Sequence, residues 1–120
     1  MKKGLRLTGR RDFQRLLSSR RLYAGQAIVG FAAPGRAAAG NRVGVGVSRQ
    51  IKGAVARNRA RRRLREALRL RLENPDSRWS EAGITFDMVV IARPATLEMS
   101  FSELEAEAGR FLRRLHAGSA

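Results

Sequence analysis

Residues 54 to 73 combine the chain's densest run of arginines with an apolar stripe at helical spacing. The stripe recurs every three or four residues and consists of Ala56, Ala60, Leu64, Ala67 and Leu68. Arginines fill most of the remaining positions, and like charges at this spacing destabilise an isolated helix by about 0.2–0.5 kcal/mol per pair. The pattern therefore predicts a long helix that must be held by packing its apolar face on the rest of the fold.

The arginines of this segment predict one connected positive surface. Four of them, spaced by four residues, would form a ridge: Arg57, Arg61, Arg65 and Arg69. Arg62 lies beside the ridge, and Glu66 is nearly the only acid that could relieve the repulsion. A phosphate backbone would turn this repulsion into attraction. The alternatives are a solvated charged face and a membrane-surface helix, the second disfavoured because the segment lacks aromatic anchors.

The charge of the whole chain also indicates a polyanionic partner. The 120 residues include 25 Lys and Arg against 10 Asp and Glu, a formal net charge of +15. Such a charge repels itself in a compact protein, so nucleic acid is the expected partner and an anionic membrane the second choice. Genomic base composition or adaptation to heat would explain the preference for arginine over lysine, but not the excess of positive charge.

The cysteine content and the lengths of the apolar runs indicate in which cellular compartment the protein is expected. The chain has no cysteine, which excludes disulfides and thiolate metal sites and is compatible with a reducing cytoplasm. The basic start leads into no apolar stretch, so we do not expect a secretory signal. No apolar run is long enough to span a bilayer. We therefore expect a cytoplasmic protein without a membrane partner.

Helical patterns also mark both ends of the chain. Residues 8 to 19 predict a short helix with Thr8 as N-cap and an apolar stripe of Leu7, Phe13, Leu16 and Leu17. A last helix is predicted to start at a capping box of Ser102 and Glu105 and to run to about His116. Its expected inward residues are Leu104, Ala108, Phe111, Leu112 and Leu115. Its early acids, Glu103, Glu105 and Glu107, are interpreted as favouring the helix dipole and solubility.

Three segments predict strands: residues 27–33, 42–48 and 87–93. In the second, Val43, Val45 and Val47 alternate with glycines that leave the other face bare enough for a helix or ligand to approach. Residues 34–41 and 76–83, the latter with Trp79, predict loops, and Asn74-Pro75 is expected to stop the long helix. The order is helix, two or three strands, helix, strand, helix. This predicts one α+β domain over residues 1–120 with helices packed on a small twisted sheet.

The chain offers little from which to build a protein active site. His116 stands alone near the C-terminus, and Asp12, Glu66 and Asp87 are isolated in sequence. A nuclease needs clustered carboxylates for metals, or a histidine beside a nucleophile. We therefore expect no catalytic residue and no metal site in the protein, and we expect Asp87 to pair with an arginine.

The run Arg42-Val43-Gly44-Val45-Gly46-Val47-Ser48-Arg49, followed by Ala54-Val55-Ala56-Arg57-Asn58-Arg59, resembles the protein subunit of bacterial ribonuclease P. That family carries a strand of the type R-V-G-x-x-V-S-K, a turn, and then A-V-x-R-N-R-x-[KR]-R with L-R-E close behind. Leu7 with Asp12-Phe13, residues 87–94 and the last helix agree as well, so the resemblance covers almost the whole chain.

The resemblance implies an accessory subunit of an endoribonuclease whose RNA performs the hydrolysis. That RNA removes the 5′ leader of precursor tRNA with Mg²⁺, which is held mainly by the RNA. The protein would bind both the ribonuclease P RNA and the leader, and no DNA. The family fold, shared with the second domain of a small-subunit ribosomal protein, places the arginine-rich helix in a left-handed β-α-β crossover, against the usual right-handed rule.

Matched residue by residue, the resemblance assigns contact with the catalytic RNA to Arg49, Lys52, Arg57, Asn58, Arg59, Arg61, Arg62 and Arg65. It assigns the cleft for the leader to Phe13, Leu17, Phe31 and Arg69. Aromatic stacking suits leaders of varied sequence, because every base has a face, and contributes about 1–3 kcal/mol per base. For the two phenylalanines, ordinary core packing is the alternative.

Some positions depart from the family pattern. Gln50 replaces a usual basic residue and Gly53 is shifted by one, so the turn into the helix is expected to differ locally. Leu17 stands where many members have a second cleft aromatic, which predicts weaker stacking. Arg63 replaces a usual apolar residue and is expected to add a phosphate contact. Two competing functions remain, a structural RNA-binding protein of the ribosomal type and a DNA-coating protein.

Overall fold

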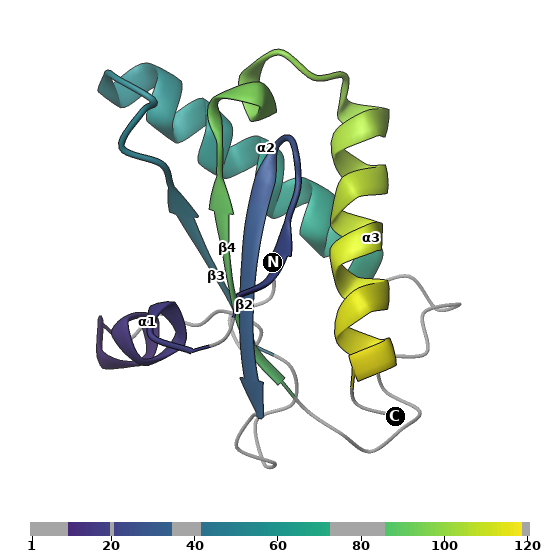
Figure 1. Ribbon diagram of the computed structural model, residues 1–120. Helices are drawn as coiled ribbons and strands as arrows, with labels where there is room; N and C mark the ends of the chain where they lie inside the picture. Colours follow the sequence, from purple (N-terminus) through teal and green to yellow (C-terminus); the bar gives the residue numbers. More distant parts are fainter. Residues whose placement is uncertain (1–9, 20, 35–41, 73–85, 119–120) are drawn as a thin grey trace.

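The computed structural model describes residues 10–19, 21–34, 42–72 and 86–118 (Figure 1). Its elements in chain order are α1 (Arg10–Leu17), β1 (Arg21–Ala24), β2 (Ile28–Pro34), β3 (Arg42–Val47), α2 (Ala54–Leu72), β4 (Phe86–Ala92), the 3₁₀ turn η3 (Pro94–Leu97) and α3 (Phe101–Gly118). The expected loops after Pro34 and around Trp79, the stop at Asn74-Pro75, and Leu7 and Thr8 lie outside the described residues. The α+β order is confirmed.

The four strands form one mixed sheet in the order β1-β2-β4-β3. β2 runs antiparallel to both β1 and β4, whereas β3 runs parallel to β4 with Arg42 opposite Asp87. Two adjacent parallel strands need a crossover connection, and α2 provides it. This β3-α2-β4 unit is the crossover whose left-handed sense the resemblance implies.

The main core lies between the sheet and two helices, α2 and α3. The predicted stripe of α2 faces it, with Ala60, Leu64, Ala67 and Leu68 fully buried. The three alternating valines of β3 face it too, as predicted. In Figure 1, α3 lies on one side of the strands and α1 on the other. The apolar packing that α2 needs against its own charge repulsion is therefore present.

A glycine on β2 lets α3 approach the sheet closely. A Cβ atom built at Gly30 would lie 2.3 Å from the ring of Phe111, a buried residue of α3. Such a distance leaves no room for any side chain. The ring of Phe111 also meets the edge of Tyr23 at 6.2 Å between centroids, which ties α3 to β1.

The other side of the sheet, here called the outer sheet face, carries a smaller apolar cluster. Leu16 of α1 and Val89 of β4 are fully buried there, with Phe13, Ala33 and Ile91 packed against them. Phe13 also lies 3.8 Å from the position that a Cβ of Gly46 would take, so a glycine of β3 borders α1 as expected. Leu17 does not join the buried stripe, because 46% of it is exposed.

The last helix begins two residues earlier than predicted. Ser100, not Ser102, is the N-cap, since its side-chain oxygen accepts a hydrogen bond of 3.2 Å from the backbone N–H of Glu103. The spacing S-x-x-E occurs twice, at Ser100 with Glu103 and at Ser102 with Glu105. The prediction took the second pair as the capping box, whereas the structure uses the first. All five predicted inward residues are buried: Leu104, Ala108, Phe111, Leu112 and Leu115.

Candidate nucleic-acid interface

The turn into α2 is built around Gly53 and Arg57. Gly53 has a φ of +90°, a conformation that side chains rarely adopt, which explains a glycine at the shifted position. The guanidinium of Arg57 donates hydrogen bonds to the carbonyl oxygens of Ser48 at 3.0 Å and Ile51 at 3.1 Å. Arg57 therefore closes the turn between β3 and α2, in addition to its predicted contact with RNA.

The solvent side of α2, together with the turn that precedes it, carries a positive surface, here called the basic face. It consists of Arg49, Lys52, Asn58, Arg59, Arg61, Arg62 and Arg65, all exposed or half-buried. Arg61 donates to the side chain of Asn58 at 2.8 Å. Within the described part of the chain, Arg59 and Arg62 have no hydrogen bond or ion pair to another residue. These two exposed arginines are the ones best placed to meet phosphates.

Two arginines of α2 are engaged with the protein instead. Arg63 donates to the backbone carbonyls of Thr96, at 3.0 Å, and Met99. It thereby ties α2 to the segment before α3, a structural role that the sequence did not predict. Arg69 donates to Glu66, and this hydrogen bond lowers the pKa of the Glu66 carboxyl below its usual value. Glu66 thus stays ionised and offsets one positive charge of the helix.

The structure brings three of the predicted cleft residues to the outer sheet face. Phe31 lies opposite Val89, whose side chain is buried under Leu16 of α1, so Phe31 shares that face with α1. Phe13 and Phe31 are both half-buried, which leaves part of each ring open to solvent. Leu17 is exposed on the same helix. Arg69 is not grouped with them, because α2 packs on the opposite side of the sheet.

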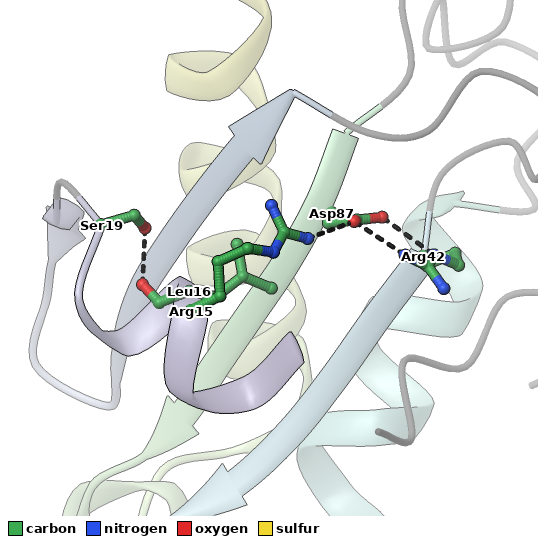
Figure 2. Close-up of polar contacts among 5 residues, drawn as sticks. All are labelled: Arg15, Leu16, Ser19, Arg42 and Asp87. Atoms are coloured by element: carbon green, nitrogen blue, oxygen red, sulfur yellow. Dashed lines mark hydrogen bonds and ion pairs between the residues drawn. The ribbon is translucent and has the colours of Figure 1, made fainter. Parts of the chain in front are cut away.

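A buried carboxylate with two arginines lies on the same face (Figure 2). The carboxylate of Asp87, with no solvent exposure, accepts two hydrogen bonds from Arg42, at 2.9 and 2.8 Å, and one from Arg15 at 2.6 Å. Burial favours the protonated form, but these hydrogen bonds outweigh burial and hold the pKa of Asp87 below its usual value. The expected pairing of Asp87 with an arginine is confirmed.

Arg15 and Arg42 were not among the predicted site residues. Arg42 is the first residue of β3 and lies directly opposite Asp87, the second residue of the parallel strand β4. An arginine and an aspartate near the starts of two strands are a weak signal for such a pair, because the register is unknown beforehand. Arg15 comes from α1, and only the packing of that helix brings it near Asp87.

This arrangement offers binding groups and no catalytic cluster. In residues 10–19, 21–34, 42–72 and 86–118, no group of three or more His, Cys, Asp or Glu is placed to hold a metal ion. In the same residues, no helix has the length and apolar character needed to cross a membrane. Guanidiniums suit phosphates and aromatic rings suit bases. The chemistry available on the described surface is therefore recognition of a nucleic acid.

Comparisons with known proteins agree with this geometry. The Ribonuclease P family model matches residues 1–116. The ribonuclease P protein component of Symbiobacterium thermophilum is 39% identical over 114 residues, covering 95% of this chain and 93% of that protein. The solved RNase P protein of Thermotoga maritima is 25% identical, with a TM-score of 0.68 over 91% of this chain and 96% of that one. A mutant RNase P protein of Staphylococcus aureus, at 24% identity, has the same fold with a TM-score of 0.73 over 94% of this chain and 89% of that one. Because the family match spans nearly all residues, the chain belongs to the family of ribonuclease P protein components.

Proposed function

We propose that this subunit binds the catalytic RNA of ribonuclease P through the basic face and the 5′ leader of precursor tRNA on the outer sheet face. The observation that carries the proposal is the separation of the two surfaces. Arg59 and Arg62 project from α2, which packs on one side of the sheet, while Phe13 and Phe31 lie on the other side. One small domain can therefore contact two RNA strands at once.

The leader suits the outer sheet face because it is single-stranded. Its bases are free to stack, and the partly exposed residues Phe13 and Phe31 carry rings that accept any base. Leu17 offers an apolar contact where a third ring would stack more strongly. This combination favours affinity for leaders in general over a preference for one leader sequence.

We assign hydrolysis of the phosphodiester bond to the RNA subunit, with Mg²⁺ held by that RNA. Among the described residues of the protein, no group of three or more His, Cys, Asp or Glu is placed to hold a metal ion, so the proposal assigns Mg²⁺ to the RNA. The contribution of the protein is electrostatic. Its guanidiniums neutralise phosphates where two polyanions meet, which reduces the concentration of Mg²⁺ needed to bring them together.

A reconstitution assay tests this function. The purified protein is mixed with a bacterial ribonuclease P RNA and a precursor tRNA at a Mg²⁺ concentration too low for the RNA alone. We expect leader cleavage only when both subunits are present, and none from the protein by itself. Unchanged cleavage on adding the protein would favour the alternative, a structural RNA-binding protein of the ribosomal type, which the family match already disfavours.

A variant of Phe31 tests the assignment of the outer sheet face. Phe31→Ala is expected to weaken binding of precursor tRNA by about 1–3 kcal/mol, the contribution of one stacked base, and to leave binding of mature tRNA unchanged. The measurement is the affinity of the reconstituted holoenzyme for both RNAs. Equal losses for the two would remove leader stacking from the proposal. Arg113→Ala, an exposed change on α3, is the matched control.

A further inference from the structure

Three exposed arginines outside the basic face and the outer sheet face gather at the turn between β1 and β2. Arg93, directly after β4, donates a hydrogen bond of 2.8 Å to the carbonyl oxygen of Gly25 in that turn. Arg110 and Arg114, one helical turn apart on α3, both interact with Tyr23 of β1. These three arginines, here called the hairpin arginines, bring positive charge from the end of β4 and from α3 to one edge of the sheet.

Other contacts already anchor this turn to the fold. The buried carboxylate of Glu107 accepts hydrogen bonds from the backbone N–H groups of Gln26, at 3.0 Å, and Ala27, at 2.8 Å. The buried hydroxyl of Thr96 donates to the carbonyl oxygen of Ala27 at 2.8 Å. The turn is therefore tied to α3 and η3 by buried groups. The exposed arginines come in addition to these bonds and lie on a firm support.

The protein orients these guanidiniums while they remain open to solvent. Arg114 lies over the ring of Tyr23, 5.8 Å from its centroid, and donates a long hydrogen bond of 3.5 Å to Leu22. The side chain of Arg110 is 52% exposed, and its ion pair with Glu107 is 3.9 Å long. Hydrogen bonding to Tyr23 raises the pKa of Arg110, which keeps that residue charged. A guanidinium has five N–H donors, so the contacts among the described residues leave donors for an anion.

The chemistry of this edge suits phosphates better than bases. The ring of Tyr23 has Arg114 over one face and meets the ring of Phe111 at an interplanar angle of 60°. A base could stack on the covered face only by displacing the guanidinium. Guanidiniums themselves match the geometry of phosphate oxygens. The favoured occupant is therefore an RNA backbone whose bases are already paired with one another.

The position of the hairpin arginines favours the catalytic RNA as the source of that backbone. α3 packs on the same side of the sheet as α2, which is the side away from Phe13 and Phe31. The strands β1 and β3 are the two edges of the sheet, three strand spacings or about 14 Å apart. An RNA on the basic face of α2 and an RNA on the hairpin arginines would thus approach one side of the fold at separate points.

We propose that the hairpin arginines bind phosphates of a base-paired segment of the catalytic RNA, as a third RNA-contact surface at the β1 edge of the sheet. Tyr23 acts as a positioning residue, since it holds two of the three guanidiniums. Two separated contacts on one side of the fold would fix the orientation of the subunit on the RNA, which contact through one helix does not. This inference rests on the proposed function only because it takes ribonuclease P RNA as the partner.

Two charge-matched variants on α3 test the surface. Arg114→Gln removes a hairpin arginine, and Arg113→Gln removes its exposed neighbour, which has no hydrogen bond or ion pair to another of the described residues. In titrations of the catalytic RNA without tRNA, Arg114→Gln is expected to reduce the slope of affinity against salt by about 0.9. With curves that converge near 1 M salt, this means about eightfold weaker binding at 0.1 M. Arg113→Gln should change the slope much less, and equal changes would overturn the proposal.

A purely structural role of Arg114 predicts a different pattern. Arg114→Lys keeps the charge and can still lie over an aromatic ring, so it is expected to bind with nearly the wild-type salt slope. A slope as low as that of Arg114→Gln would count against a phosphate contact. If Arg114→Gln lowered the melting temperature and left the slope unchanged, Arg114 would serve only the hairpin, and the proposal would be wrong.

A tethered probe identifies the RNA that covers this edge. Because the chain has no cysteine, the exposed turn residue in Gln26→Cys can carry the only source of hydroxyl radicals. In the holoenzyme with precursor tRNA, we expect strand cuts in a paired segment of the catalytic RNA. Gln14→Cys, exposed on α1, is the control and should cut at other positions. Cuts from position 26 that fall only in the tRNA, or in neither RNA, would exclude the catalytic RNA as the occupant.

The proposed function and this inference fail in different experiments. If Arg59→Ala and Arg62→Ala did not weaken binding of the catalytic RNA, the proposed function itself would fail. If they weaken it, and Arg114→Gln weakens it no more than Arg113→Gln does, only the third surface is lost.

Discussion

Asp87 shows how a single carboxylate can be both fully buried and ionised. Burial opposes its charge, and the hydrogen bonds from Arg42 and Arg15 reverse that effect, so its pKa lies below the usual value. In the unfolded chain the same group titrates near pH 4. The folded state therefore binds the carboxylate proton more weakly than the unfolded state does. The pairing stabilises the fold at neutral pH and must lose its effect in acid.

The first prediction concerns this loss. The contribution of Asp87 is fully present above its unfolded pKa of about 3.9 and disappears as the pH falls through its lower folded pKa. We expect wild-type protein to be more stable than Asp87→Asn at about pH 7, with the gap closing below about pH 4. The measurement is the free energy of unfolding in urea at a series of pH values. Glu66, whose pKa is also lowered, is present in both proteins and cancels. A gap that stays constant into strong acid would contradict this account of Asp87.

The sequence could predict the type of residue that a side chain contacts, but not which residue of that type it contacts. That Asp87 pairs with an arginine follows from the rule that buried charges need partners, but the identity of Arg15 depends on how α1 packs. From the sequence, Glu107 was interpreted as one of the acids near the helix start that favour the helix dipole and solubility. It is instead buried and accepts hydrogen bonds from the backbone N–H groups of Gln26, at 3.0 Å, and Ala27, at 2.8 Å. No local pattern joins residues about eighty positions apart.

At the scale of elements, α2 divides its arginines between folding and binding. Arg57 bonds the turn at its start and Arg63 bonds the carbonyls before α3, whereas Arg59 and Arg62 point into solvent. Helical spacing predicted a ridge from Arg57 to Arg69, but the four arginines of that ridge are half-buried, whereas Arg59 and Arg62 beside it are exposed. The residues that bind RNA are therefore expected to be concentrated where the helix faces away from the core.

The second prediction separates these two groups on α2. Arg59→Ala and Arg62→Ala should each weaken binding of the catalytic RNA and reduce the slope of affinity against salt by about 0.9 or less, without lowering thermal stability. Arg57→Ala should lower the melting temperature as well, because the carbonyl oxygens of Ser48 and Ile51 lose their donor. The measurements are binding titrations at several salt concentrations and thermal unfolding of each variant.

Arg113 provides the control for these variants. It is exposed on α3, so Arg113→Ala removes one positive charge without touching the basic face. If this change reduced the salt slope as much as Arg59→Ala does, net charge would explain the binding and α2 would have no special part. If Arg57→Ala left the melting temperature unchanged, the hydrogen bonds from Arg57 to the turn would not contribute to the stability of the fold.

Elements with a strong local pattern were predicted, and elements that depend on neighbours were not. The long helix and the strands β2, β3 and β4 lie within one or two residues of the predicted ranges. β1, with only four residues and an irregular register against β2, was not located, because a short strand has too few positions to display alternation. For the site, the density of arginines predicted a positive helix, and the family resemblance supplied the residues of the basic face and the grouping of Phe13 with Phe31. The position of Asp87 on the same face as these rings follows from the topology of the sheet.

At the scale of the whole molecule, several acids of the described residues are engaged within the protein, whereas most of the described arginines are exposed or half-buried. Asp87 and Glu107 are buried, and Glu66 and Glu105 pair with Arg69 and Arg71 on the helices. Lys and Arg outnumber Asp and Glu by 15, so a formal net charge of +15 remains whichever ion pairs form. Mutual repulsion of these charges opposes the compact state until a polyanion binds. The free subunit is expected to be less stable than the same subunit on RNA.

The third prediction is that salt stabilises the free protein. Raising NaCl from about 20 mM to about 500 mM shortens the screening length from roughly 20 Å to roughly 4 Å, which suppresses repulsion between exposed arginines. The buried pairs at Asp87 are screened much less, so the net effect is favourable. Each kcal/mol of relieved repulsion should raise the melting temperature by about 4 °C, measured by thermal unfolding at constant pH. A short polyphosphate should act at far lower concentration than chloride, because it binds the folded state rather than only screening it. A melting temperature that falls across this range would mean that surface ion pairs, and not repulsion, dominate the electrostatics of the fold.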